Sequence, residues 1–225
     1  MSTMPRSPIR AFATVAIVLF SASLPIVHAQ APVVDAAHGE QLATNSVPPC
    51  ASCHGPDGAG MPAAGFPRIV GQSSEYLAKQ LSDFTSGTRA SPIMGPIAKA
   101  LSAPDIADVS AYYAAKTHVA WTAEKADAKL ILTGKTIANL GDAKAGVQAC
   151  GNCHGPDGRG EAPYNPPLRG QSAVYITAQL NAWRQGTRHN DSGELMSGLA
   201  KRLTPADITA VSAYFASLPA PQTAD

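Results

Sequence analysis

The sequence has little charge and no cluster of basic residues. Charged side chains make up 15% of its 225 residues. Two of the 17 basic residues, Arg6 and Arg10, lie in an N-terminal segment that we expect to be removed, which leaves 15 basic against 16 acidic residues and a net charge of −1. A nearly neutral chain without a basic patch gives a nucleic acid little to bind, so we expect no such partner.

Long β-branched runs are also scarce, and the motifs of several enzyme classes are missing. The 19 prolines and 19 glycines mark many turns, so we predict an all-α fold with long loops. The sequence has no catalytic triad, no phosphate-binding loop and no pair of acids suited to acid–base chemistry. Asp57 and Asp157 lie in glycine-rich turns, where an aspartate is more often a turn former than a catalytic acid. We therefore do not expect an enzyme.

The first 29 residues have the pattern of a secretory signal peptide. Two arginines precede an apolar run over residues 11–24, and residues 27–29 form a small-x-small cleavage site. The run is short for a membrane span and ends at Pro25, which favours cleavage after Ala29 over retention as an anchor. No later run is long and apolar enough to cross a bilayer. We expect a periplasmic mature chain without a transmembrane segment, for which peripheral association with a membrane stays open.

One nine-residue stretch occurs twice. Cys50-Ala-Ser-Cys53-His54-Gly-Pro-Asp-Gly returns one hundred residues later as Cys150-Gly-Asn-Cys153-His154-Gly-Pro-Asp-Gly. Two cysteines separated by two residues and followed by a histidine form the attachment signature of c-type haem. The two thiols add to the two vinyl groups of one haem, and the adjacent imidazole reaches the iron. We therefore predict two covalently bound haem c groups, held by the four cysteines.

Four cysteines have two other common uses, a pair of disulfides or one zinc ion held by four thiolates. The gap from Cys53 to Cys150 far exceeds the usual spacing within a zinc ribbon. Zinc also gives no reason for a histidine after each cysteine pair, and the Gly-Pro-Asp-Gly that follows is repeated too. Covalent haem is the favoured prediction.

The repeated motif lies within a repeated series of helices. The first helix is predicted over residues 33–44 and its counterpart over residues 123–139, and each contains a glycine, Gly39 and Gly134. A glycine inside a helix costs about 1 kcal/mol relative to alanine. Its repetition indicates a close crossing by another helix, for which the last helix of each half is the expected partner.

A second helix follows each haem motif, with Ser73 or Ser172 as its expected N-cap. Both helices end in Gly-Thr-Arg, where the glycine is a plausible C-cap. We leave two roles open for the arginines, Arg89 and Arg188: binding a haem propionate, or a solvated side chain after the cap. One face of each helix forms a stripe that we expect to join the core and a haem face, made of Tyr76, Leu77, Gln80, Leu81 and Phe84, repeated as Tyr175, Ile176, Gln179, Leu180 and Trp183.

The last helix of each half begins with the spacing of a capping box, at Ser102 to Asp105 and at Thr204 to Asp207. The chain is thus an internal duplication with its boundary near residues 117–120. We predict a signal peptide over residues 1–29, an N-terminal domain over 30–118 and a C-terminal domain over 119–225. The tail from Pro219 is expected to be frayed.

His54 and His154 can supply one axial ligand to each iron, and the opposite face of each iron needs another donor. Met61 follows His54 by only seven residues, which leaves little chain to reach around the haem edge. Met94 and Met196 follow the two histidines by 40 and 42 residues, one in each repeat. A lone methionine is usually core filler, but this repeated placement favours ligation, since a thioether is a known partner of histidine on haem iron.

Three histidines compete with the methionines as donors: His118, His38 and His189. None of them has a counterpart in the other repeat, although His189 lies near Met196. The predicted metal ligands are His54, Met94, His154 and Met196.

The duplicated attachment motif, the Gly-Gln-Ser helix start, the methionine loop and the final Asp-Ile…Ser-Ala-Tyr-Tyr helix resemble the dihaem cytochrome c4 family over nearly all of the mature chain. The resemblance implies two tandem class I cytochrome c domains related by pseudo-twofold symmetry, with His/Met ligation at both irons. It also implies that Nδ1–H of each histidine donates to a proline carbonyl, which maps onto Pro67 and Pro166. Three extra residues around 189–194 depart from the repeat and leave the geometry of the second site open.

The primary prediction for function is a periplasmic dihaem carrier of single electrons. Protein ligands on both faces leave neither iron an open site, and axial methionine raises the haem potential. The resemblance implies redox proteins as partners, with a terminal oxidase as acceptor and the bc1 complex or another donor upstream. The alternative is the dihaem subunit of a dehydrogenase, such as the flavocytochrome that oxidises sulfide. A dihaem peroxidase is disfavoured because it needs one displaceable ligand.

Overall fold

The computed structural model describes residues 34–116, 119 and 121–220. The predicted signal peptide and most of the predicted boundary at 117–120 lie outside these residues. In the described part every regular element is a helix, joined by loops that contain three isolated β-bridges, so the predicted all-α class is confirmed. No helix in this part is long and apolar enough to cross a membrane.

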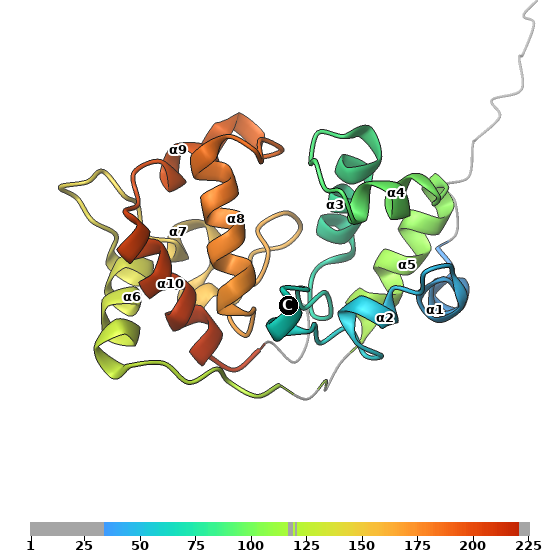
Figure 1. Ribbon diagram of the computed structural model, residues 1–225, viewed down its shortest axis with the longest axis horizontal. Coiled ribbons are helices and arrows are strands. Elements are labelled where there is room, and N and C mark those ends of the chain that lie inside the picture. The colour runs from blue at the N-terminus through green and yellow to red at the C-terminus, as the bar shows by residue number, and fades with distance from the viewer. Residues whose placement is uncertain (1–33, 117–118, 120, 221–225) are drawn as a thin grey trace, which may run out of the picture. The chain divides into compact units, whose positions relative to one another are not determined.

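The helices form a series that occurs twice along the chain. Each half has an opening helix, a single turn at the cysteine pair, a long helix, a short helix and a closing helix (Figure 1). The first series is α1 (Ala36–Asn45), α2 (Ala51–His54), α3 (Ser74–Ser86), α4 (Met94–Lys99) and α5 (Ala103–Ala115), with the 3₁₀ turn η1 (Pro62–Ala64). The second is α6 (Ala128–Leu140), α7 (Gly151–His154), α8 (Ala173–Gln185), α9 (Leu195–Ala200) and α10 (Pro205–Ser217), with the turns η2 (Pro156–Gly158) and η3 (Ser192–Glu194).

The opening and closing helices of each half cross at a glycine, as the sequence predicts. A Cβ atom at Gly39 would overlap the carbonyl of Asp108 on α5, and one at Gly134 would overlap the carbonyl of Ala210 on α10. Figure 1 shows α1 beside α5 and α6 beside α10. Both opening helices begin later than predicted because Asp35 and Asp127 cap them, their side chains accepting from the first free amides.

The predicted caps of the other long helices are confirmed. The hydroxyls of Ser73 and Ser172 accept from the amides three residues on, at the starts of α3 and α8. Gly87 and Gly186 end these helices in the left-handed conformation, with φ of 84° and 74°. Both capping boxes are complete, with the Asp105 and Asp207 side chains accepting from the backbone of the N-cap residue.

Each half has its own hydrophobic core between its closing helix and its neighbours. In the second half the core is built on α10, whose Ile208, Val211 and Phe215 are almost fully buried. The expected fraying of the tail is wrong at its first two residues. Ala220 is only 5% exposed and packs against Gly170, while Arg169 Nε donates to the Pro219 carbonyl at 2.8 Å.

Candidate functional site

The two cysteine pairs lie on single helical turns with the same backbone geometry. The His54 amide donates to the Cys50 carbonyl at 2.9 Å, and the His154 amide donates to the Cys150 carbonyl at 2.9 Å. Side chains three apart on such a turn share a face. None of the four cysteines forms a disulfide, so all four sulfur atoms remain available for attachment to haem.

The histidine of each motif is buried and held by one hydrogen bond. His54 and His154 are each 7% exposed. His54 Nδ1 lies 2.9 Å from the Pro67 carbonyl oxygen, and His154 Nδ1 lies 2.8 Å from that of Pro166. Burial lowers the pKa of both imidazoles, and the bond to the proline carbonyl opposes this shift. A neutral ring that donates from Nδ1 keeps the lone pair of Nε2 for a metal, so the orientation implied by the resemblance is confirmed.

Both turns open onto one cavity of about 1490 Å³. A site for a single small ligand usually has roughly 300–1,000 Å³, so this cavity is large enough for more than one extended planar group. Its wall contains both cysteine pairs, both motif histidines and a repeated set of apolar side chains from the long and closing helices: Leu77, Leu81 and Val109 in the first half and Ile176, Leu180 and Val211 in the second. The residues present therefore fit two haem groups.

The two methionines of the predicted ligand set lie on the wall of this cavity, in short helices. Met94 begins α4 and Met196 lies in α9. Their loops are anchored differently. The Met94 amide donates to Ser91 Oγ at 3.0 Å, whereas the Asp191 carboxylate accepts from the amide and the hydroxyl of Ser197, both at 2.8 Å. The extra residues of the second loop form η3 and supply this anchor, and Met196 still lines the cavity.

Of the competing donors, those in the described part of the chain do not line the cavity. Met61 is 43% exposed and sits in an isolated bridge with Phe66. His38 is bonded to Asp108 between α1 and α5, and the His189 side chain is exposed. His118 lies outside the described residues.

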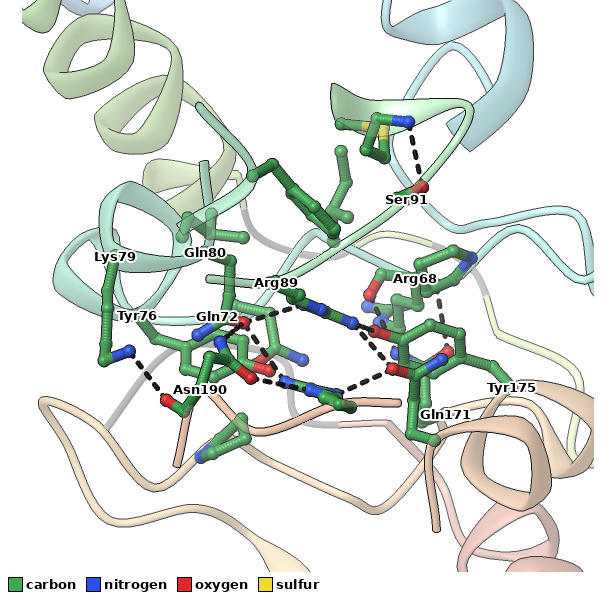
Figure 2. Close-up of a pocket in the computed structure, with 18 of the residues that line it drawn as sticks. Arg68, Gln72, Tyr76, Lys79, Gln80, Arg89, Ser91, Gln171, Tyr175 and Asn190 are labelled. Atoms are coloured by element: carbon green, nitrogen blue, oxygen red, sulfur yellow. Dashed lines mark hydrogen bonds between the residues drawn. The ribbon is translucent and has the colours of Figure 1, made fainter. Parts of the chain in front are cut away.

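The two repeated arginines are buried where the halves meet. Arg89 is 7% exposed and Arg188 is 5% exposed, so the solvated role is wrong for both. Arg89 donates to the Tyr175 hydroxyl in the other half at 2.8 Å (Figure 2). It also donates to Gln179 Oε1 in that half at 2.8 Å. Arg188 reaches Gln80 Oε1 across the same boundary at 3.1 Å. Both arginines line the cavity and their hydrogen-bond partners are neutral, so the propionate role stays a prediction.

The sequence pattern does not predict the role of two glutamines. Gln80 and Gln179 belong to the stripe expected to join the core and a haem face, but their Oε1 atoms accept hydrogen bonds from the two arginines. Gln80 Oε1 lies 2.7 Å from Arg89 Nη1, and Gln179 Oε1 lies 2.7 Å from Arg188 Nη1. A polar residue repeated at the same place in an apolar stripe was the available signal.

Comparison with known proteins identifies the class of this protein. The profile of the cytochrome c family matches residues 36–115 and 118–219, so the chain belongs to the cytochrome c family. With one such domain in each half, it is a dihaem c-type cytochrome whose haem c binding sites are at Cys50/Cys53 and Cys150/Cys153.

Within this class the chain is cytochrome c4-like. It is 38% identical over 186 residues to cytochrome c4 of Pseudomonas aeruginosa, which covers 82% of this chain and 89% of that protein. The crystal structure of reduced recombinant cytochrome c4 from Pseudomonas stutzeri matches with a TM-score of 0.74 and 34% identity, over 83% of this chain and 100% of that one.

Two further relatives are named for thiosulfate oxidation. The chain is 45% identical over 169 residues to the thiosulfate dehydrogenase electron acceptor of Stutzerimonas stutzeri strain A1501, covering 75% of this chain and 78% of that protein. The structure of thiosulfate dehydrogenase (TsdBA) from Marichromatium purpuratum matches with a TM-score of 0.76 and 38% identity, over 82% of this chain but only 40% of that longer one. These matches show that the chain is a dihaem electron carrier and not an enzyme, and that its partners are redox proteins.

Proposed function

We propose that this protein is a periplasmic carrier that accepts single electrons from a thiosulfate-oxidising dehydrogenase and passes them toward a terminal oxidase. The observation that carries the proposal is the repetition of one complete site. In each half a cysteine pair, a histidine oriented by a proline carbonyl and a methionine line the same cavity. The donor is inferred from the relatives named as thiosulfate dehydrogenase electron acceptors.

The location and the domain limits are part of the proposal. Cleavage after Ala29 would release a periplasmic chain, with an N-terminal domain over residues 30–118 and a C-terminal domain over 119–225. Peripheral contact with the membrane would bring such a carrier to a membrane-bound oxidase.

The proposed iron ligands are His54 and Met94 in the first half and His154 and Met196 in the second. Bound haem c supplies a one-electron iron couple. The proline carbonyl of each half accepts Nδ1–H and so fixes the orientation of the imidazole. The thioethers of Met94 and Met196 would favour a high potential, and an iron held by both a histidine and a methionine would have no position left for oxygen or peroxide. This arrangement suits transfer of electrons and not chemistry on a substrate.

The apolar wall of the cavity has a separate task. Leu81 and Val109 in the first half and Leu180 and Val211 in the second face the space that the haem groups would occupy. They would exclude water from most of each ring and so lower the reorganisation that accompanies a change of charge.

Methionine substitutions test the ligands one half at a time. Met94→Ala and Met196→Ala should each abolish the thioether–iron absorption of one haem and lower its potential, while the other haem stays nearly unchanged. Met61→Ala is the matched control because Met61 lies off the cavity wall, and its spectrum should equal that of the wild type. A silent Met196→Ala together with an altered His189→Ala would assign the second ligand to His189.

Stopped-flow reduction tests the donor. The holoprotein should be reduced rapidly by a thiosulfate dehydrogenase supplied with thiosulfate, and not by thiosulfate alone. Reduction by a bc1 complex with quinol is the comparison, and reoxidation by oxidase-containing membranes tests the acceptor. Fast reduction by the bc1 complex alone would show that the proposed donor is wrong. Stable co-purification with a sulfide-oxidising flavoprotein would support the alternative of a dehydrogenase subunit.

A further inference from the structure

The two halves differ at one buried position beside the cavity. The proline that orients the motif histidine is followed by Arg68 in the first half and by Pro167 in the second. The next residue donates its amide to the carbonyl of Gly58 in one half and of Gly158 in the other, at 2.9 and 2.8 Å. The two segments are therefore in the same register, and only the first half has a cation at this point of the wall.

The Arg68 side chain is buried and forms no ion pair; burial lowers the pKa of its guanidinium, and the charge of Asp57 only opposes this shift. The residue is 4% exposed and lines the cavity. Neither Nε nor Nη1 has a hydrogen-bond partner among the described residues, and no described carboxylate forms an ion pair with it. Its guanidinium lies over the Trp121 ring, 5.7 Å from the centroid. A buried charge with unpaired N–H groups is costly unless an anion compensates it.

The main chain of Arg68 is fixed from the other half of the molecule. Gln171 Oε1 accepts from the Arg68 amide at 3.0 Å, and Gln171 Nε2 donates to the Arg68 carbonyl at 2.9 Å (Figure 2). The reciprocal contact is weaker. Gln72 Nε2 reaches the Pro167 carbonyl at 3.5 Å, and Gln72 Oε1 has no partner in the described structure, because Pro167 lacks an N–H group. Arg68 is thus held in place more firmly than its counterpart.

We propose that Arg68 binds a propionate carboxylate of the first-half haem and raises the reduction potential of that haem above the value it would have without the cation. The fork of a guanidinium matches a carboxylate, and two N–H groups of Arg68, at Nε and Nη1, have no hydrogen-bond partner in the described structure. A nearby positive charge disfavours the oxidised iron, which carries one more positive charge than the reduced iron. The second half, with Pro167, has no equivalent group. The inference rests on the proposed His/Met ligation for the assignment of each haem.

Substitution of Arg68 in the holoprotein tests the proposal. Arg68→Gln should lower the potential of the first-half haem by about 59 mV. For a one-electron couple this corresponds to a change of about tenfold, in favour of the second haem, in the equilibrium ratio of the two singly reduced forms. Arg68→Lys keeps a positive charge without the fork, so it should shift the same potential in the same direction by less. Arg169→Gln is the matched control, because Arg169 donates to the Pro219 carbonyl and is not on the cavity wall. It should leave both potentials unchanged.

The two potentials are read separately from the methyl resonances of Met94 and Met196 during a redox titration. An unchanged first-half potential in Arg68→Gln, or an equal shift of both potentials, would overturn the proposal. If Arg68→Gln does not fold, Arg68→Met takes its place, since it also removes the charge and an unchanged first-half potential there would overturn the proposal. Absence of both methyl resonances in the wild type would instead disprove the proposed ligation. In that case an optical redox titration tests Arg68. It shows one reduction step for each haem, and Arg68→Gln should shift the midpoint potential of only one of the two steps.

Discussion

Some equivalent positions around the cavity are occupied by different residues in the two halves. Tyr113 and Phe215 occupy the same place, packed over Gly58 and Gly158. The Tyr113 hydroxyl is buried without a partner among the described residues, and burial strongly raises its pKa, so it stays protonated. Together with Arg68 it makes the first site more polar than the second. The two haem environments are therefore not copies of each other.

The hydrogen bond between His38 on α1 and Asp108 on α5, called the histidine link below, makes a pH-dependent contribution to stability. His38 Nδ1 lies 2.9 Å from Asp108 Oδ2, and this bond is the main cause that raises the histidine pKa, with Asp105 and Asp35 adding to it. A group whose folded pKa is raised contributes stability that is fully present below its unfolded pKa and is lost as pH rises through the folded pKa. The melting temperature of the wild type should exceed that of His38→Gln at about pH 5.5, and the difference should shrink by about pH 9.

The control for this link is His189→Gln, since the His189 side chain is exposed. It should melt like the wild type at both pH values. A difference for His38→Gln that is the same at both values would show that protonation of the ring has no part in the link.

At the scale of helices, each half depends on one close crossing. Gly39 on α1 and Gly134 on α6 let the closing helix approach until backbone meets backbone, with Asp108 and Ala210 opposite them. A glycine inside a helix costs about 1 kcal/mol relative to alanine. The packing gained at the crossing must therefore outweigh the low helix propensity of glycine. The capping boxes of α5 and α10 then fix where the closing helices begin.

Gly134→Ala tests the crossing. Its methyl group would overlap the Ala210 carbonyl and push α6 away from α10, which we expect to destabilise the protein by about 1–3 kcal/mol. Chemical denaturation monitored by circular dichroism measures this loss. Gly186→Ala is the comparison, because a Cβ there meets nothing within 4 Å and costs only the strain of the left-handed conformation, about 1 kcal/mol. A stabilised Gly134→Ala would mean that helix propensity decides and the crossing is loose.

At the scale of the whole molecule, the halves are joined by a hydrogen-bond network of buried polar groups. Arg89 and Arg188 each bond to a glutamine of both halves, and Asn190 Nδ2 donates to Gln80 Oε1 at 3.1 Å. Burial and the neighbouring Arg89 lower the pKa of Arg188. Such a network stabilises the contact between the two halves only while each of its buried donors has a hydrogen-bond acceptor.

Removing one arginine should therefore weaken the join between the halves. In Arg89→Gln, Tyr175 and Gln179 lose a charged donor, and each buried group left unpaired costs about 1–3 kcal/mol. We expect lower stability and, in calorimetry, unfolding of the halves in separate steps. Arg184→Gln, an exposed arginine on α8, should unfold like the wild type. A single unaltered transition for Arg89→Gln would show that the network does not join the halves. The predicted binding of a haem propionate by Arg89 has its own measurement, a changed pH dependence of one haem's potential in the same variant.

The charge is divided unevenly along the chain, which bears on partner choice. The proposed domains 30–118 and 119–225 carry −2 and +1, apart from any propionates. A dipolar carrier can be steered to different partners by its two ends. Charge reversal at Lys201 and Arg202 should change the rate of either reduction or reoxidation, with a changed salt dependence, and spare the other. Equal effects on both rates, or none, would favour one docking site or an inert charge difference.

The features that depend on neighbours along the chain can be predicted from the amino-acid sequence. It predicted the haem attachment turns, the all-α class, the helix caps at Ser73 and Gly87 and the glycine crossings, because these follow from local backbone chemistry and from a repeat. The packing of the two halves was needed to show what Arg89 bonds to, why a polar Gln80 lies among apolar side chains and that Ala220 packs against Gly170. It also showed that Arg68 is buried and clamped by Gln171. These contacts join segments that are in part about a hundred residues apart, so their partners are set by how the halves pack and no local pattern contains them.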